Sequence, residues 1–159
     1  MKIQIICIGK LKEKYWTAAA EEYVKRLSRY CDVQITELKE ARLPDKASEA
    51  EEQQVIEEEG SSILKNIKDG SYVISLEIKG DAISSEELAQ KMNRLMTGGK
   101  SHVTFIIGGS LGLSGRVSGR ADMKLSFSKM TFPHQMKRII MLEQIYRSFK
   151  IISNETYHK

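Results

Sequence analysis

The sequence HVTFIIGGSLG at residues 102–112 joins a run of apolar and β-branched residues to a turn rich in glycine. Such a short run, bounded by a turn signal, predicts a buried strand. Comparable runs occur at residues 1–9, 33–38 and 72–78. Between them, apolar residues recur at helical spacing at residues 15–30, 49–67 and 84–97. Strands that alternate with helices predict an α/β fold with a mainly parallel sheet and flanking helices.

Length and composition limit the possible classes of protein. A chain of 159 residues with 41% apolar residues predicts one domain over residues 1–159 with its own core. No apolar run approaches the roughly 20 residues of a membrane-spanning helix, and residues 1–9 lack the cleavage site of a signal peptide. Cys7 and Cys31 are the only cysteines and have no CxxC spacing. We therefore expect a cytoplasmic protein without disulfides, membrane anchor or bound metal.

Charged residues are unevenly distributed along the chain, whose net charge is +4. Residues 37–60 hold nine acids against three bases, whereas residues 123–159 hold seven bases against two acids. Residues 1–30 also hold an excess of bases, seven against three. This asymmetry favours an anionic partner that both ends of the chain meet together. The alternative is that these charges only form solvated faces.

The glycine-rich turn at residues 108–112 is the first candidate site. Glycines at the carboxyl end of a strand let a ligand approach the backbone closely, although a tight turn without a ligand is an equally simple interpretation. The pattern Gly108-x-Ser110-x-Gly112 also matches the nucleophile elbow of serine hydrolases, with Asp122 and His134 following in triad order. Against a hydrolase, residues 113–119 contain glycines and do not predict the long helix that such an elbow opens. Neither GxGxxG nor GxxxxGK[ST] occurs.

The sequence LSFSKMTFPHQ at residues 125–135 is the second candidate site. It predicts a dense polar and aromatic loop that opens a helix through Pro133, which suits the first helical turn. Loops that open helices present free backbone N–H groups and a positive dipole end to a ligand. The apolar stripe of the predicted helix, which ends near Ile152, is too wide for a simple surface helix. We expect it to be buried against its own sheet and against another subunit.

Several long motifs together resemble one known family. They are GKLKEKY at residues 9–15, FIIGGSLGL at 105–113, residues 125–135 with Arg138, EQIYR at 143–147 and YHK at 157–159. The chain resembles the ribosomal RNA large subunit methyltransferase H family, the small single-domain SPOUT methyltransferases. The resemblance implies an alpha/beta knot, a sheet with a C-terminal trefoil knot, and a homodimer that binds S-adenosylmethionine. It also implies methylation of N3 of a pseudouridine in helix 69 of 23S ribosomal RNA within the 70S ribosome.

The resemblance also implies site residues. The cofactor contacts would be Leu76, Gly108, Phe127, Ser128, Lys129, Met130, Thr131 and Phe132. Methylation of N3 requires loss of the imide proton, which a nearby base would assist. The first candidate for that base is His134, followed by Tyr157 and His158 on a tail able to cover the cofactor of the neighbouring subunit. Arg138 and Lys129 are candidates for binding phosphate or stabilising the imide anion.

The tail departs from the family pattern. The residues before Tyr157 are Ser153-Asn154-Glu155-Thr156, where the family usually has Arg-Gly-Glu-Pro. The loss of a base and of a stiff proline predicts weaker ordering of the tail or weaker contact with RNA. Two other functions stay open at this point: a serine hydrolase acting through Ser110, and a non-catalytic module that binds ribosomes.

Overall fold

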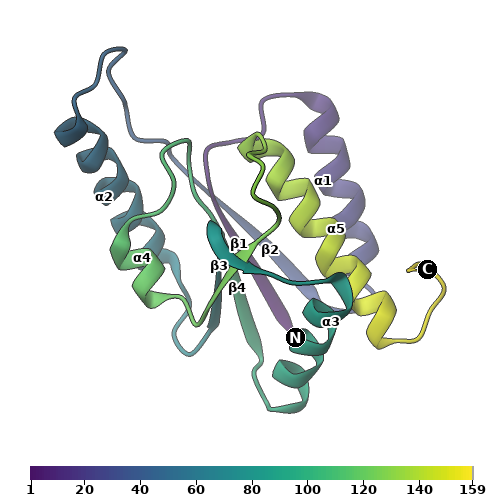
Figure 1. Cartoon of the computed structure of the whole chain (residues 1–159). Coiled ribbons are helices and arrows are strands. Elements are labelled where there is room, and N and C mark those ends of the chain that lie inside the picture. Colours follow the sequence, from purple (N-terminus) through teal and green to yellow (C-terminus); the bar gives the residue numbers. More distant parts are fainter. Residues whose placement is uncertain (159) are drawn as a thin grey trace.

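The sheet contains five parallel strands in the order β2-β1-β4-β3-β5, and the computed structural model describes residues 1–158 (Figure 1). The strands are β1 (Lys2–Ile8), β2 (Asp32–Leu38), β3 (Tyr72–Ala82), β4 (His102–Ile107) and β5 (Met123–Ser126). The first four confirm the predicted strands and the α/β class. The fifth was not predicted, because it is only four residues long and overlaps the segment interpreted as a loop.

Five helices connect and cover the strands. They are α1 (Lys14–Leu27), α2 (Glu49–Asn66), α3 (Ser85–Thr97), α4 (Gly115–Arg120) and α5 (His134–Ile152). Ser48 and Ser84 each begin a helix through a capping box, in which the serine hydroxyl accepts a hydrogen bond from the backbone N–H three residues later. Helices α1, α3 and α5 cover one face of the sheet, and α2 and α4 cover the other (Figure 1).

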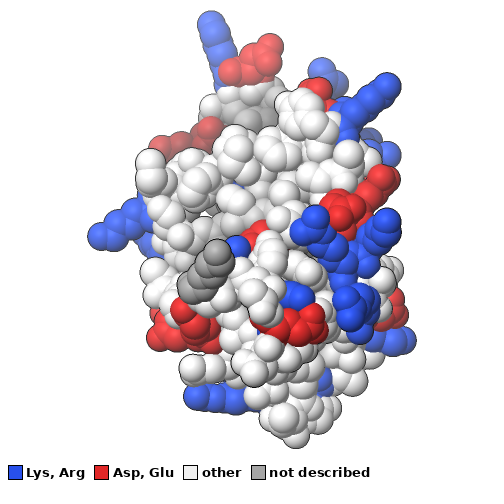
Figure 2. Space-filling model, turned by 90° about the vertical axis from the view of Figure 1, so that its right-hand side faces the viewer, with Lys and Arg blue, Asp and Glu red and all other residues white. Residues whose placement is uncertain are grey.

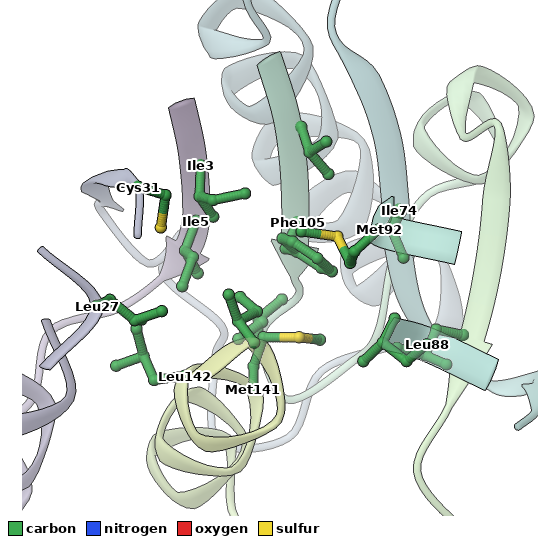
Figure 3. Packing of buried hydrophobic residues seen from close by; sticks show 14 of the residues in the cluster. Ile3, Ile5, Leu27, Cys31, Ile74, Leu88, Met92, Phe105, Met141 and Leu142 are labelled. Carbon is green, nitrogen blue, oxygen red and sulfur yellow. The ribbon is translucent and has the colours of Figure 1, made fainter. Parts of the chain in front are cut away.

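The core consists of one apolar layer on each face of the sheet. Along β1, Ile3, Ile5 and Cys7 face α1 and α5, whereas Ile6 and Ile8 face α2 and α4. Figure 3 shows the larger layer, with side chains of the sheet facing those of the covering helices. Because both faces are covered, the inner strands β1 and β4 are largely apolar and buried, which is typical of parallel sheets.

Helix α5 packs between α1 and α3 on one face of the sheet. Every residue from 134 to 152 is buried or half-buried. The predicted burial of its wide apolar stripe against the sheet is therefore confirmed, and the neighbouring helices account for its two flanks. The predicted contact with another subunit stays a prediction.

A bulge interrupts the pairing of β3 with β5. Leu125 is the partner of both Leu76 and Asp81, so residues 77–80 leave the ladder; we call them the β3 bulge. The bulge packs directly on the backbone of β5, because a Cβ atom placed on Gly80 would lie 2.7 Å from the carbonyl carbon of Leu125. A glycine is needed at this close approach. Glu77, Ile78 and Lys79 of the bulge line the cavity described below.

Candidate functional site

A cavity of about 560 Å³ lies at the carboxyl ends of β3, β4 and β5. Three segments form its walls: Leu76 with the β3 bulge, the glycine-rich turn after β4, and the segment from the end of β5 to the start of α5. The structure brings together seven of the eight predicted cofactor residues there, namely Leu76, Gly108, Phe127, Ser128, Met130, Thr131 and Phe132. Lys129 is exposed and does not line the cavity.

The glycine-rich turn contributes only backbone to the cavity wall at Gly108 and Gly112. A Cβ atom on Gly108 would lie 2.8 Å from Leu113 Cδ2 and 3.1 Å from the carbonyl oxygen of Gly112. Gly112 has a φ of +86°, a left-handed conformation that favours glycine. Behind the turn lies Glu59, whose pKa is raised by burial and whose carboxylate would be 2.9 Å from a Cβ atom on Gly109. The turn is therefore packed tightly from behind and open toward the cavity.

The loop after β5 is joined to the β3 bulge by hydrogen bonds. The Ser126 hydroxyl is 3.1 Å from the carbonyl oxygen of Ile78 and 3.2 Å from that of Ser128, and donates toward both. The backbone N–H of Met130 donates to the Ser128 hydroxyl at 2.9 Å. These bonds fix the spacing between two walls of the cavity. Ile78 and Met130 remain 56% and 73% exposed, so the cavity has an apolar rim.

Three charged residues of the cavity were missed by the sequence reasoning. Glu77 and Lys79 belong to the β3 bulge, and Lys137 lies in the first turn of α5. The Glu77 carboxylate accepts hydrogen bonds from the Ser75 hydroxyl at 2.6 Å and from the Ser118 hydroxyl at 3.1 Å. The only signal in the sequence was the spacing of Ser75 and Glu77, which places both on one face of a strand.

Arg138 lies in the interior, where it anchors the first turns of α5. Its side chain is 3% exposed and forms a salt bridge with Glu37, with 2.6 Å between Nη1 and Oε2. Nη2 donates to the carbonyl oxygen of Gly9 at 2.9 Å. Burial, the largest effect on the neighbouring Cys7 thiol, raises its pKa to about 11. The guanidinium is thus committed to the protein and does not line the cavity.

His134 begins α5 beside the same loop. Its Nε2 atom would be 3.7 Å from a Cβ atom on Gly9, which has a φ of +86°. One residue further, the Gln135 side-chain oxygen accepts a hydrogen bond from the backbone N–H of Lys12 at 3.1 Å. The start of α5 is therefore held against residues 9–12, and His134 is half-buried next to the cavity loop rather than in the cavity lining.

The tail residues Tyr157 and His158 fold back onto α5 of the same chain. The Tyr157 hydroxyl donates to Glu143 at 3.1 Å, and the Arg147 guanidinium lies 4.8 Å from the centroid of the Tyr157 ring. Glu143 also binds Arg147 at 2.6 Å, one helical turn further along α5. His158 lies between Arg147 and Glu86, at 3.1 and 2.7 Å. Glu143 and Arg147 thus organise the tail.

These contacts change the ionisation of the tail groups. Burial, followed by nearby polar groups that include the Glu143 carboxylate, raises the pKa of Tyr157 to about 12. A hydrogen bond from its own backbone N–H, followed by one with His158, lowers the pKa of Glu86 to about 2. Tyr157 therefore keeps its proton, and Glu86 stays ionised, over the whole neutral range of pH. Residues 153–156, which differ from the family pattern, are also held in place: Glu155 accepts a hydrogen bond from the Tyr30 hydroxyl at 2.8 Å and pairs with Lys150.

The face that carries α5 has a mixed pattern of charge. Figure 2 shows a broad area without charge, with groups of Lys and Arg and groups of Asp and Glu around it.

Within residues 1–158, no three or more His, Cys, Asp and Glu side chains form a group that could hold a metal ion. No helix in that part of the chain combines the length and the apolar character needed to cross a membrane.

The structure excludes the serine hydrolase interpretation. Asp122 precedes β5, and its carboxylate accepts hydrogen bonds from the backbone N–H of Val73 at 2.8 Å and from Arg120 at 3.3 Å. Ser110 and His134, by contrast, follow the carboxyl ends of β4 and β5. Because all strands are parallel, Asp122 lies at the opposite edge of the sheet from the other two. The triad order in the sequence was therefore a coincidence.

Comparisons with known proteins agree over the full length of the chain. Residues 1–158 match the protein family described as "Predicted SPOUT methyltransferase". Two proteins called "Ribosomal RNA large subunit methyltransferase H", from Clostridium novyi and Alkaliphilus oremlandii, are 56% and 57% identical over 159 residues, covering 100% of both chains in each case.

A solved structure, that of a probable methylase family protein from Haemophilus influenzae, has a TM-score of 0.55 and 14% identity. The alignment covers 96% of this chain and 66% of that one, just under two thirds of its length. At this low identity the likeness extends to the fold alone.

Proposed function

The chain belongs to the SPOUT methyltransferases, in the ribosomal RNA large subunit methyltransferase H family, and we propose that it methylates N3 of a pseudouridine in helix 69 of 23S ribosomal RNA. The observation that carries the proposal is the identity above 50% along the entire chain, with the cavity residues in place. We further propose that it acts in the cytoplasm on the 70S ribosome.

The cavity suits S-adenosylmethionine, the cofactor of this family. Its volume of about 560 Å³ lies in the range typical of pockets for ligands of that size. Phe127 and Phe132 offer aromatic rings for an adenine, and the glycine-rich turn lines the cavity with three residues that have no side chain, Gly108, Gly109 and Gly112. Glu77, Lys79 and Lys137 offer charges for the amino-acid part. When bound, the cofactor supplies an electrophilic methyl group, and the surrounding residues orient it.

Membership in the family implies the C-terminal trefoil knot. The segments that meet near it are the β3 bulge and the loop after β5, which the Ser126 hydroxyl joins. Both segments line the cavity. We propose that these two segments, whose linked residues Ile78 and Ser126 lie 48 positions apart, belong both to the knot and to the cofactor site.

For the chemical step, we propose that His134 accepts the N3 proton or orients the target base. Its position at the start of α5, beside the cavity loop, supports this role. The exposed Lys129 is free to meet an RNA phosphate. His158 and then Tyr157 are the next candidates for the role proposed for His134, although the raised pKa of Tyr157 makes it a weaker one. Glu143 and Arg147 hold both side chains in place. Arg138 is proposed to act indirectly, by fixing the start of α5 that carries His134, because its guanidinium is bound to Glu37 and to the carbonyl oxygen of Gly9.

His134→Ala and His158→Ala test the proposed base. If His134 is the base, His134→Ala lowers the single-turnover rate about 100-fold, the usual contribution of a positioned proton acceptor, and leaves cofactor affinity unchanged. The measurement is transfer of labelled methyl groups to ribosomes at a series of pH values. Unchanged rates in both variants would remove the base role from both histidines.

We also propose a homodimer. The exposed side chains of Ile78 and Met130 on the cavity rim would be covered by a second subunit. Sedimentation equilibrium measures the molecular mass directly, and a mass of one chain at micromolar concentration would contradict this part of the proposal.

The methyltransferase activity is tested in two steps. Calorimetric titration with S-adenosylhomocysteine should show binding, and a non-catalytic ribosome-binding module should show none. Labelled S-adenosylmethionine and ribosomes that lack the modification should then give one labelled nucleotide in 23S ribosomal RNA. Binding of the cofactor without any transfer to ribosomes would overturn the proposed substrate.

A further inference from the structure

Glu77 is the one carboxylate that lines the cofactor cavity among residues 1–158. It projects from the first position of the β3 bulge, directly after Leu76. Ser75, which is fully buried, donates to one of its oxygens, and Ser118 on α4 donates to the other. Each oxygen is thus held by a hydroxyl of the protein. The carboxylate therefore has a fixed position at the cavity wall.

The charge of Glu77 is not matched by a protein cation. Glu77 forms no salt bridge with any Lys, Arg or His among the described residues, although Lys79 and Lys137 line the same cavity. A half-buried carboxylate is stabilised by a nearby positive charge, because burial removes part of its hydration. Two hydroxyl donors satisfy part of its hydrogen-bonding capacity and leave its net charge in place.

We infer that Glu77 binds a positively charged centre of the cofactor, and this inference rests on the proposed function. S-adenosylmethionine carries two such centres, the sulfonium and the α-ammonium group, and a carboxylate is the natural partner of either. The serine pair orients the carboxylate before the ligand arrives, so little side-chain freedom is lost on binding. If the partner is the sulfonium, the contact weakens when the methyl group leaves, because the product is a neutral thioether. Glu77 would then favour release of the product.

Three ligands separate the possible partners of Glu77. S-adenosylmethionine has both positive centres, S-adenosylhomocysteine has the ammonium alone, and 5′-methylthioadenosine has neither but keeps the adenine and ribose. Affinities of the wild type and of Glu77→Gln for all three are measured by calorimetry in the absence of ribosomes. Glutamine keeps the shape and removes the charge. In Glu77→Gln we expect an affinity loss of about 10- to 100-fold for each ligand that carries the positive centre bound by Glu77, as for a charge-assisted hydrogen bond.

The pattern of losses decides the inference. A loss for S-adenosylmethionine alone supports the sulfonium as partner, and equal losses for the first two ligands with none for the third support the ammonium. Equal losses for all three ligands would instead indicate an uncharged contact, such as one to the ribose, and would overturn the inference. Unchanged affinities would overturn it as well. If the wild type bound none of the ligands, the proposed function itself would fail.

Two further variants control for folding and for general charge. Asp81→Asn removes an acid from the same strand; its side chain is exposed and does not line this cavity, so affinities should not change. Ser118→Ala removes one of the two hydroxyl donors and should give a smaller loss in the same order of ligands. It tests the inference even if Glu77→Gln fails to fold, because equal effects on all three ligands would contradict a charged partner.

Discussion

Replacing Glu37 by glutamine is expected to destabilise the protein by about 3–5 kcal/mol, because it leaves the charge of Arg138 buried without a counter-ion. The Arg138 side chain is only 3% exposed, and an arginine does not escape the cost by losing its proton. The melting temperature should fall by about 10 °C in a chain of this size. Urea denaturation followed by circular dichroism measures the free energy of unfolding directly.

Removing the other partner of this salt bridge, Arg138, is expected to lower the free energy of unfolding by less. Arg138→Met leaves the Glu37 carboxylate, whose side chain is 34% exposed and is able to regain water. We expect a loss of about 1–3 kcal/mol, and a double variant that is more stable than the sum of the two single losses predicts. If Arg138→Met were as destabilising as Glu37→Gln, the interpretation of Arg138 as the more deeply buried partner would be wrong.

The second large effect is expected at the glycine-rich turn. Gly108→Val should lower cofactor affinity by about 10- to 100-fold, the effect of the roughly 1–3 kcal/mol that overpacking typically costs. A Cβ atom at this position would already lie 2.8 Å from Leu113 Cδ2, so the Leu113 side chain has to move. It would also lie 3.1 Å from the carbonyl oxygen of Gly112, so the turn has to yield slightly, and the two methyl groups of valine add to the crowding. Both of these residues line the cavity. Calorimetry with S-adenosylhomocysteine measures the effect.

Gly119→Val is the matched control for this substitution. A Cβ atom on Gly119 would have no neighbour within 4 Å, and the residue lies in α4 away from the cavity lining. This variant should bind the cofactor like the wild type. An affinity of Gly108→Val within threefold of the wild type would show that the turn is not a wall of the cofactor site.

The sequence was most informative where structure is determined locally. The strands β1, β3 and β4 contain apolar runs, and the helices α2 and α3 have apolar residues at helical spacing. Such signals depend on neighbouring residues alone, and the structure confirms them. The same holds for the turn at residues 108–112, since glycines after a buried strand mark the carboxyl edge of a parallel sheet.

The sequence was least informative where partners are distant. Arg138 was expected to bind phosphate or stabilise the imide anion, because the sequence does not reveal that its partner is Glu37, 101 positions away. Strand β5 has only four residues and pairs with a strand that begins about fifty residues earlier. The role of Glu77 depends on Ser118, which is 41 positions away on another element. Such non-local contacts leave no periodic signal in the chain.

The three walls of the cavity also have an order in time. Synthesis produces the β3 wall first, then the glycine-rich turn, and the segment at residues 126–137, which joins β5 to α5, last. A growing chain that has emerged only as far as α4 already contains the four strands β1 to β4, yet it lacks one wall and the bonds made by Ser126. The cofactor therefore cannot serve as a template for the early stages of folding. The sheet has to form from its own contacts, and ligand binding becomes a property of the nearly finished chain.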